Sequence, residues 1–410
     1  MIILAAMQNR LITLLCCWLL VLASATRAAG QGAHIRIVGE GAARTRLSLD
    51  GLEADATAEA RQFMGALTAS LMRAGWFDLV EGGAVGVAVA GTVTGGASPR
   101  VRVTARNPVT GRVYLNRTFQ DAPPRRLAHQ VCDAIVEAVK GVPGIASLRV
   151  AAVGSRNGRR DLYLMDMDGG DLVQLTHDGH PCLSPDWFPD GRSLVYMSMH
   201  RGFPDIYRID LDTMRRSVVS AQSGLNVSPA VSPDGRELAL TLSRDGNPEL
   251  YVMTLRTGRL ERLTRTPHAA EASPAWSPDG RQLVYVSDTT GRPQLYVIAR
   301  AGGPSRRITY RGTENVNPHW GPDGRIVFSS RRDGQYRLCV IDPATGEDVQ
   351  VTQDAADYEN PFWLPNGRHV LADRTARYKT DIYLIDTRGD APVRLTTAAG
   401  DWYSPAATSR

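Results

Sequence analysis

Short apolar runs that alternate with polar residues recur through residues 148–407, and turn residues separate one run from the next. In the clearest copy, the runs fall within residues 273–287, 294–298 and 307–309. Runs of this length with a two-residue period, bounded by Gly, Pro, Asn or Asp, are typical of β-strands. Each unit therefore predicts four short β-strands joined by turns.

A Pro-Asp-Gly or Pro-Asn-Gly turn marks five of these units, at intervals of 44, 45, 44 and 43 residues. Proline presets one φ angle and glycine permits a positive φ, so these tripeptides favour tight turns. Roughly 40–45 residues with four strands is the size of a propeller blade, and the 3.6-residue period of helical repeats is absent. The turns are centred on Asp190, Asp234, Asp279, Asp323 and Asn366.

Two other landmarks give six units. A third-strand pattern such as Asp161-Leu162-Tyr163 occurs six times, and so does a fourth-strand ending such as Leu175-Thr176. The first unit lacks an inner strand, and residues 403–407 supply one at the other end of the chain. Pairing the two ends would close the ring and hide its edge strands. The predicted fold is an all-β six-bladed β-propeller, closed by pairing of the chain ends and preceded by a small α/β domain.

The region ahead of the propeller has a different pattern. Apolar positions in residues 57–76 have helical spacing, with Asp55 or Thr57 as a candidate N-cap, and a second helix is predicted over 125–140, ending at Gly141. Strand-like runs lie between them at 77–80, 87–93, 100–103 and 113–115. We assign residues 39–145 to an α/β domain and 146–410 to the propeller.

The N-terminus resembles a secretory signal. An apolar stretch at residues 11–23 follows Arg10 and ends in Ala23-Ser24-Ala25, which predicts a signal peptide over 1–25. The stretch is too short for a stable membrane span. Residues 26–38 are predicted to be a flexible N-terminal segment, and the alternative is that this segment is the first strand of the α/β domain, since residues 34–38 alternate.

Composition limits the chemistry. The net charge is +5 and the pI about 9.0, but lysine occurs only at Lys140 and Lys379 of the mature chain and the arginines are dispersed, so a nucleic-acid footprint is not supported. Cys132, Cys182 and Cys339 are too widely spaced for a disulfide framework. No cofactor or metal site is predicted.

The repeat frame, typified by Ser-Pro-Ala-Trp-Ser-Pro-Asp-Gly at 273–280, together with the 302–309 and 249–253 runs, the signal and the short α/β domain, resembles the TolB family. TolB proteins are periplasmic propellers of the Tol-Pal cell-envelope system. The resemblance implies a non-enzymatic periplasmic adaptor that supports outer-membrane integrity and constriction at cell division. It implies that a Pal-like peptidoglycan-associated lipoprotein docks on one propeller face, so that the protein is peripheral to the outer membrane, and that a TolA-like inner-membrane protein engages the N-terminal segment.

The resemblance also places these contacts on residues of this chain. The inter-blade loops should lie on one face, around the channel mouth, and the loop positions before the Ser/Asn-Pro of each inner strand resemble the family's Pal contacts. Leu225 stands where family members often carry histidine. The Pal-like candidates are Leu225, Ser228, Ala272 and Ser273, with Glu271, Asn315, Asn317, Tyr358, Asn360, Trp402 and Tyr403 as neighbouring rim candidates. The TolA-like candidates are Ala28, Gln31, His34, Ile35 and Ile37.

Other readings of these residues stay open. Some propeller lyases use histidines with a metal, and His180, His268 and His319 fall on the same predicted face, but they are more than 50 residues apart and a metal needs about three converging ligands. A stand-alone carbohydrate-binding propeller is a third class. The acidic run 166–171 has spacing faintly like a calcium loop but lacks the terminal glutamate. Tryptophans recur at one blade position, where packing between blades is expected, at Trp187, Trp276, Trp320 and Trp363.

Overall fold

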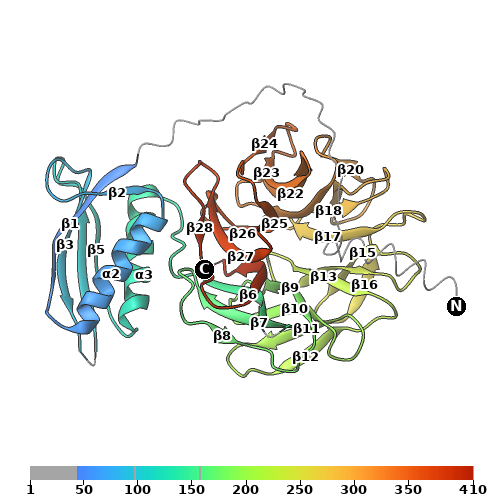
Figure 1. Cartoon of the computed structure of the whole chain (residues 1–410), viewed down its shortest axis with the longest axis horizontal. Coiled ribbons are helices and arrows are strands. Elements are labelled where there is room, and N and C mark those ends of the chain that lie inside the picture. The colour runs from blue at the N-terminus through green and yellow to red at the C-terminus, as the bar shows by residue number, and fades with distance from the viewer. Residues whose placement is uncertain (1–43, 97, 157, 410) are drawn as a thin grey trace. The chain divides into compact units, whose positions relative to one another are not determined.

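The computed structural model describes residues 44–96, 98–156 and 158–409, which form an α/β domain and a β-propeller (Figure 1). The predicted signal peptide at 1–25 and the segment at 26–38, with all five TolA-like candidates, lie outside the described residues. Within the described part, no helix is long and apolar enough to span a membrane.

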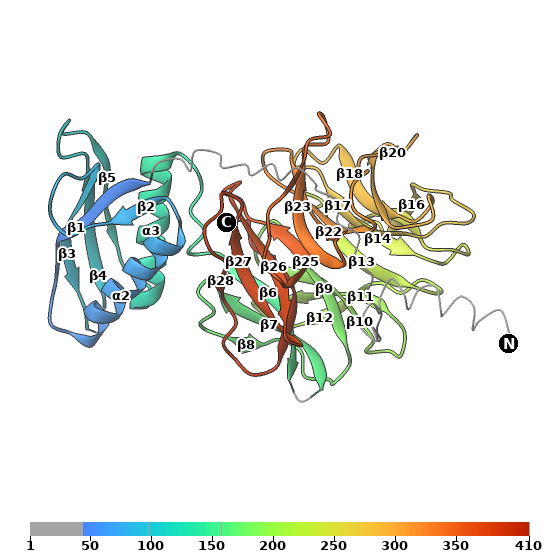
Figure 2. The ribbon, with the colours of Figure 1, turned by 45° about the horizontal axis from the view of Figure 1, so that its top comes forward.

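The α/β domain has a five-stranded sheet in the order β2-β1-β3-β4-β5, with two helices on one of its faces (Figure 2). β1 lies in the sheet interior and pairs in parallel with β2 and β3, and the sequence analysis assigned no strand to it. The elements are β1 (Thr45–Ala54), α2 (Ala58–Arg73), β2 (Phe77–Leu79), β3 (Val87–Thr94), β4 (Arg100–Arg106), β5 (Val113–Phe119) and α3 (Pro124–Lys140).

Capping chemistry sets the helix ends. Thr57 is the N-cap of α2, and its Oγ1 accepts a hydrogen bond from the backbone N–H of Ala60 at 3.2 Å. α3 ends at Gly141, whose φ of 69° is readily adopted by glycine. The apolar faces of both helices, with Phe63, Leu67 and Ile135 fully buried, share one core with the sheet.

Six four-stranded sheets form the propeller, as predicted. Blades 1 to 5 follow the chain in order, and blade 6 combines β29 with β6, β7 and β8. Blade 1 consists of β9 (Cys182–Trp187), β10 (Ser193–Ser198), β11 (Asp205–Asp210) and β12 (Arg216–Ser220), and blade 2 of β13 (Asn226–Val231), β14 (Glu237–Leu242), β15 (Glu249–Thr254) and β16 (Arg259–Arg262). Blade 3 consists of β17 (Glu271–Trp276), β18 (Gln282–Ser287), β19 (Gln294–Ala299) and β20 (Arg306–Arg307), and blade 4 of β21 (Asn315–Trp320), β22 (Ile326–Arg332), β23 (Gln335–Ile341) and β24 (Asp348–Gln350). Blade 5 consists of β25 (Asp357–Trp363), β26 (His369–Ala376), β27 (Lys379–Asp386) and β28 (Val393–Arg394), and blade 6 of β29 (Asp401–Ala407), β6 (Arg149–Arg156), β7 (Arg159–Asp166) and β8 (Val173–Gln174).

The ring closes through blade 6. β29 pairs antiparallel with β6, from Asp401 opposite Ser155 to Ala407 opposite Val150. The backbone N–H of Thr408 adds a hydrogen bond to the carbonyl of Arg149 at 3.0 Å. The predicted pairing of the chain ends is confirmed.

The third-strand pattern and the fourth-strand ending, the two landmarks that recur in the sequence, contact each other in the structure. In blade 6, the Thr176 hydroxyl accepts from the backbone N–H of Leu162 at 2.9 Å and donates to the carboxylate of Asp161 at 2.9 Å. The same threonine hydroxyl accepts a backbone N–H of the third strand in blades 2, 3, 4 and 5. The recurring Leu-Thr ending therefore fixes the outer strand to the start of the third strand.

The recurring tryptophans pack between blades, as expected. Trp187 of blade 1 lies in a core cluster with residues of blade 6, and its indole N–H donates to the carbonyl of Ala406 at 3.0 Å. Trp276 of blade 3 makes the equivalent bond to Ala230 of blade 2, also at 3.0 Å. Trp187 and Trp276 therefore both pack and orient adjacent blades, whereas the indole N–H of Trp320 donates to Gly324 of its own blade at 2.9 Å.

Candidate functional site

The strand order gives the propeller two distinct faces. The Pro-Asp-Gly turns and the hairpins between third and fourth strands lie on one, here the turn face. The hairpins between second and third strands and the inter-blade loops lie on the other, here the loop face. Among the described residues, and apart from the linker after α3, every hydrogen bond and ion pair between the α/β domain and the propeller lies on the turn face of blades 5 and 6. These hydrogen bonds and ion pairs to the α/β domain therefore do not extend to the loop face.

Each inner strand carries a bulge at the Ser/Asn-Pro pair. The pairing register with the second strand shifts there in all six blades, and the Ser or Asn adopts a positive φ. Left-handed backbone costs a non-glycine residue roughly 1–2 kcal/mol, so six such positions are a built feature of the ring. The proline that follows has no N–H, which suits a strand edge facing the channel. The positive-φ residues are Ser184, Ser228, Ser273, Asn317, Asn360 and Ser404.

The structure divides the Pal-like candidates into two rows. Glu271, Asn315, Tyr358 and Trp402 occupy the same position, two residues before the bulge, and their side chains are fully buried. They lie inside inner strands instead of in the preceding loops, where the sequence analysis had placed them. Because strand residues alternate between faces, this row points into the blades.

The buried row supports the loops. Asn315 donates through Nδ2 to the carbonyl of Arg311 at 2.9 Å, which holds its inter-blade loop. The indole N–H of Trp402 donates to the carbonyl of Ala398 at 3.2 Å, and the Tyr358 hydroxyl accepts from Arg374 Nε at 2.9 Å. These buried side chains thereby support the residues of the loop face.

Glu271 belongs to a buried pair of carboxyl groups. Its Oε1 accepts from the Ser287 hydroxyl at 2.8 Å, and its Oε2 accepts from the Thr266 hydroxyl. Burial, together with the nearby Glu249, raises the pKa of Glu271 to about 7. Glu249 instead receives the backbone N–H of Thr266 at 2.6 Å and Arg262 at 2.8 Å. Thr266 thus ties both acids to the loop before β17.

The second row is partly exposed. The bulge residues Ser228, Ser273, Asn317 and Asn360 line the channel with half-buried side chains, and Ala272 is half-buried beside Ser273. Leu225 is half-buried in the loop before β13, where its backbone N–H donates to the Ser243 hydroxyl at 2.9 Å. Tyr403 is nearly buried, with 9% of its surface exposed.

Three exposed aromatic residues on the loop face escaped the sequence analysis. Phe203 lies in the hairpin between β10 and β11, Tyr378 in the hairpin between β26 and β27, and Tyr310 in the loop before β21. Arg307 lies over the Tyr310 ring at 4.9 Å from its centroid. Large exposed aromatic side chains are enriched at protein interfaces. They vary from blade to blade, so the repeat pattern gave no signal for them.

The channel contains a cavity of ≈410 Å³ that all six inner strands line, towards the turn face. Two polar side chains occupy equivalent positions in blades 1 and 4: Asp186 accepts the backbone N–H of Val231 at 2.8 Å, and His319 Nδ1 accepts that of Trp363 at 3.1 Å. Burial raises the pKa of Asp186 to about 7 and lowers the pKa of His319 to about 4. Both groups therefore join neighbouring inner strands.

The histidines considered for a metal do not come together. His319 lies in the channel wall, His180 packs edge-on against His200 with ring centroids 5.6 Å apart, and His268 is exposed. Among the described residues, no three His, Cys, Asp or Glu side chains are grouped so that they could hold a metal ion.

The acidic run at 166–171 faces Arg125 and His129 of the α/β domain. Arg125 Nη2 lies 2.6 Å from Asp166 and 3.2 Å from Asp171, and His129 Nε2 lies 3.1 Å from Asp168. Burial alone would raise the pKa of Asp168, but His129, the Gly170 N–H and Arg125 hold it well below its usual range. Among the described residues, these carboxylates form one of two polar contacts between the turn face and the α/β domain.

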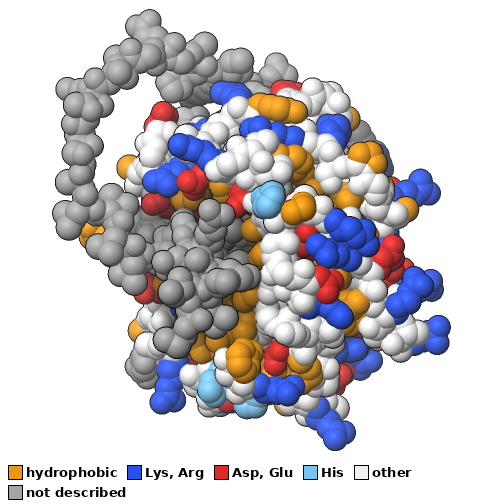
Figure 3. Space-filling model, turned by 90° about the vertical axis from the view of Figure 1, so that its right-hand side faces the viewer, with side chains coloured by type: hydrophobic (Ala, Val, Ile, Leu, Met, Phe, Trp, Pro, Cys, Tyr) orange, Lys and Arg blue, Asp and Glu red, His pale blue; other side chains and the backbone are white. Residues whose placement is uncertain are grey.

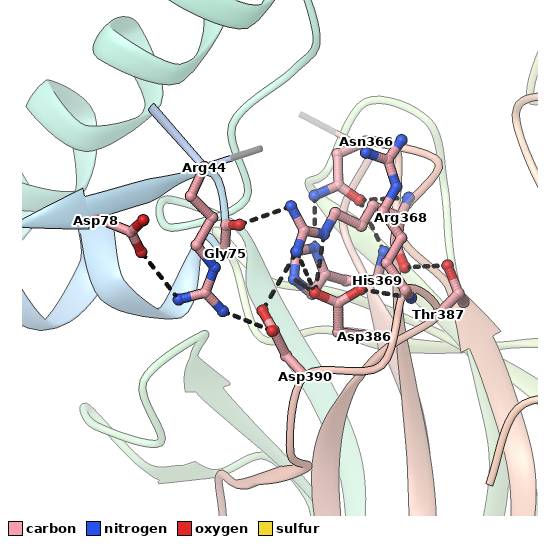
Figure 4. A network of polar contacts seen from close by, with 10 residues as sticks. Arg44, Gly75, Asp78, Asn366, Arg368, His369, Asp386, Thr387 and Asp390 are labelled. Atoms are coloured by element: carbon pink, nitrogen blue, oxygen red, sulfur yellow. Dashed lines mark hydrogen bonds and ion pairs between the residues drawn. The ribbon is translucent and has the colours of Figure 1, made fainter. Parts of the chain in front are cut away.

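The second contact centres on Arg368 (Figure 4). Its buried guanidinium donates to Asp386 through Nε at 2.8 Å and through Nη2 at 2.5 Å, and to the carbonyl of Gly75 through Nη1 at 2.7 Å. The guanidinium also lies over the Trp76 ring, 4.5 Å from its centroid. Beside it, the more exposed Arg44 bonds to Asp390 at 2.5 Å. The turn face of blade 5 is thereby fixed to the loop after α2.

The surface charge is mixed. In the view of Figure 3, Lys and Arg side chains are spread over the visible face and several lie next to Asp or Glu side chains. Arg300 on the propeller, for example, pairs with Glu237 at 2.6 Å and with Glu261 at 3.1 Å.

Comparison with known proteins gives a consistent result. Residues 136–409 match a family described as TolB beta propeller domain. The Tol-Pal system protein TolB of Bordetella avium is 30% identical over 213 residues, which cover 45% of this chain and 48% of that protein. The corresponding protein of Bordetella pertussis is 33% identical over 195 residues, 42% of this chain and 44% of that protein. The chain thus spans about half the length of the curated relatives it matches.

A solved structure extends the likeness to the α/β domain. The crystal structure of TolB from Acinetobacter baumannii is similar with a TM-score of 0.79 at 26% identity, over 89% of this chain and 96% of that one. A match of this extent includes both the propeller and most of the region ahead of it.

Proposed function

The chain belongs to the TolB β-propeller family, and on that basis we propose that it is a non-enzymatic periplasmic adaptor of a Tol-Pal cell-envelope system. It binds a Pal-like peptidoglycan-associated lipoprotein on the loop face and a TolA-like protein through the segment at 26–38. Through these partners it supports outer-membrane integrity and constriction at cell division. The predicted signal peptide carries the protein to the periplasm, where the lipoprotein holds it near the outer membrane.

The observation that carries the docking proposal is the division of the propeller into two faces. The turn face makes the contacts to the α/β domain, whereas the loop face presents the partly exposed bulge residues and the aromatic side chains of Phe203, Tyr310 and Tyr378. Exposed aromatic side chains on a rigid scaffold are typical of a protein-binding surface.

Charge and bulk at the channel mouth test this docking site. Replacing Ser228 and Ser273 together by arginine should lower the affinity for the Pal-like lipoprotein at least tenfold, about 1.4 kcal/mol, because side chains near the centre of an interface dominate affinity. Isothermal titration calorimetry measures the effect. The matched control places two arginines at exposed positions away from the loop-face centre, Ser217→Arg with Thr257→Arg. Unchanged affinity in the first variant would exclude this part of the face.

The N-terminal proposal concerns residues outside the described structure. Residues 26–33 are small and polar, and 34–38 alternate, so the segment can add as a strand to a sheet edge of a TolA-like protein. Removing residues 26–33 should weaken TolA capture strongly while leaving Pal binding and propeller unfolding nearly unchanged. A pull-down in which the shortened protein captures TolA as well as the full mature chain does would contradict the proposal.

A further inference from the structure

The last strand of the α/β sheet has an unusual charge environment. β5 stands at the end of the strand order, so among the described residues one of its edges has no neighbouring strand. The segment 82–120, which forms β3, β4 and β5, contains five arginines and no acidic residue. The five are Arg100, Arg102, Arg106, Arg112 and Arg117.

These arginines lack acidic partners. None of the five makes an ion pair with another described residue, in contrast to Arg300 or Arg368 on the propeller. Arg112 lies over the Tyr114 ring at 5.1 Å, and Arg117 over the Phe119 ring at 4.9 Å. Both guanidinium groups are thus held along the surface of β5 by aromatic rings of the same strand.

Arg102 is presented on the sheet face away from the helices. It pairs in register with Thr92 of β3 on one side and Thr118 of β5 on the other, and Thr92 pairs in turn with Glu53 of β1, which makes no ion pair with Arg102. Neighbouring strands lie about 4.8 Å apart, so a further strand beyond β5 would lie two spacings from Arg102. The short Thr118 side chain leaves room for a long acidic side chain of such a strand to reach the Arg102 guanidinium.

Charge at an edge has a general protective role. Lysine or arginine on an edge strand opposes pairing with a second copy of the same strand, because like charges would face one another. The same charges favour a strand that carries acidic residues. One set of arginines can therefore both oppose pairing with a second copy of β5 and select an acidic partner.

From this juxtaposition we propose that the free edge of β5 binds an extended acidic segment of a partner protein as a sixth strand. Main-chain hydrogen bonds to β5 supply part of the affinity, and Arg102 and Arg117 pair with acidic side chains on the two faces of the added strand. This site is separate from the loop face and from residues 26–38, so it stands or fails independently of the adaptor function.

The test uses a fluorescein-labelled ten-residue peptide that repeats Glu-Glu-Thr-Thr, which places Glu on both faces of an added strand, and its Lys-Lys-Thr-Thr counterpart, with the mature chain at low ionic strength. Fluorescence anisotropy should show binding of the acidic peptide at least tenfold tighter than that of the basic one. Arg102→Glu with Arg117→Glu should remove this preference. Arg236→Glu with Arg281→Glu, which changes the charge equally at two exposed propeller turns, should retain at least half of the affinity.

Two further measurements separate strand addition from simple charge attraction. The acidic peptide with N-methylated amides along its length should lose at least tenfold in affinity, because it cannot donate main-chain hydrogen bonds. Equal binding of the methylated peptide, or of the acidic and basic peptides, overturns the proposal. Circular dichroism and the milder Arg102→Gln with Arg117→Gln variant show whether the fold is retained, and the same loss of preference is expected of the milder pair.

Discussion

The propeller and the α/β domain of this chain are built on different principles. In the propeller, each stabilising contact occurs several times: the threonine hydroxyl that caps the third strand recurs in five blades, and the bulge recurs in all six. In the α/β domain, each contact occurs once, as in the Thr57 cap or the single core shared by two helices and a sheet. Repetition makes the propeller stability depend on closure of the ring, whereas the α/β domain depends on its own core.

The largest expected effect separates these two modes. Deleting residues 402–410 removes most of β29, the strand that closes blade 6, and with it the fully buried Trp402. Unpaired buried backbone groups cost on the order of 1–3 kcal/mol each, so we expect the propeller to unfold or aggregate. The α/β domain should keep its helices, because no propeller strand joins its sheet.

Differential scanning calorimetry and limited proteolysis measure this difference. The expected outcome is loss of the main unfolding transition, with a protease-resistant fragment that starts near residue 44 and ends near residue 145. A control chain that lacks only residues 409–410 should unfold like the parent. If the longer deletion also unfolds at the parental temperature, the chain ends do not close the ring.

The next effect concerns the contact between the two regions. Arg368→Ala leaves Asp386 as a buried carboxylate without its main partner, and breaking such a pair typically costs about 3–5 kcal/mol. Loss of the bond to Gly75 should also make the two regions unfold in separate transitions. Arg44→Ala is the matched control, because its bond to Asp390 is more exposed and should contribute under about 1 kcal/mol. Equal destabilisation of the two variants in urea would show that burial does not set the strength of this contact.

Repetition also explains what could be predicted from the sequence. Six copies of the fourth-strand ending, an aliphatic residue followed by Thr or Ser, and six of the third-strand pattern gave the blade count, and the missing inner strand gave the closure. The single strand β1 was missed because Asp50 and Gly51 interrupt its alternation, where the structure has a register shift between Ser48 and Gly51. An irregular strand that occurs once resembles a loop in the sequence, whereas a strand that recurs six times can be recognised by its repetition.

The candidate site was predicted at the level of a face but not of side chains. In a regular strand, Glu271 and Ser273 would lie on the same face. The bulge at Ser273 breaks this two-residue alternation. Contacts between the domains left no local signal, since Gly75 and Arg368 are 293 residues apart. Exposed residues such as Phe203 and Tyr378 are not repeated, and a repeat analysis passes over them.

The smallest effect is a difference in pH response between the inner strands of the propeller and its contact with the α/β domain. Burial, followed by the nearby Asp357, raises the pKa of Glu359 in β25 to about 7. The folded state then holds this proton more tightly than the unfolded state, so the contribution of Glu359 to stability is present below about pH 4 and is lost as pH rises through 7. Asp168 at the domain contact has a lowered pKa, so its contribution is present above about pH 4 and is lost at lower pH.

Glu359→Gln removes the titrating group from the propeller and should flatten the decline of unfolding free energy between pH 5 and 8 by about 1–3 kcal/mol, measured by urea unfolding at each pH. The decline will not vanish, because burial also raises the pKa of Asp186 and of Glu271 to about 7. Asp168→Asn is the opposing control: it should lower stability by a constant amount between pH 5 and 8, which leaves the slope there unchanged, and its difference from the parent should shrink on the acid side. A glutamine variant with the parental slope would mean that folding does not raise the pKa of Glu359.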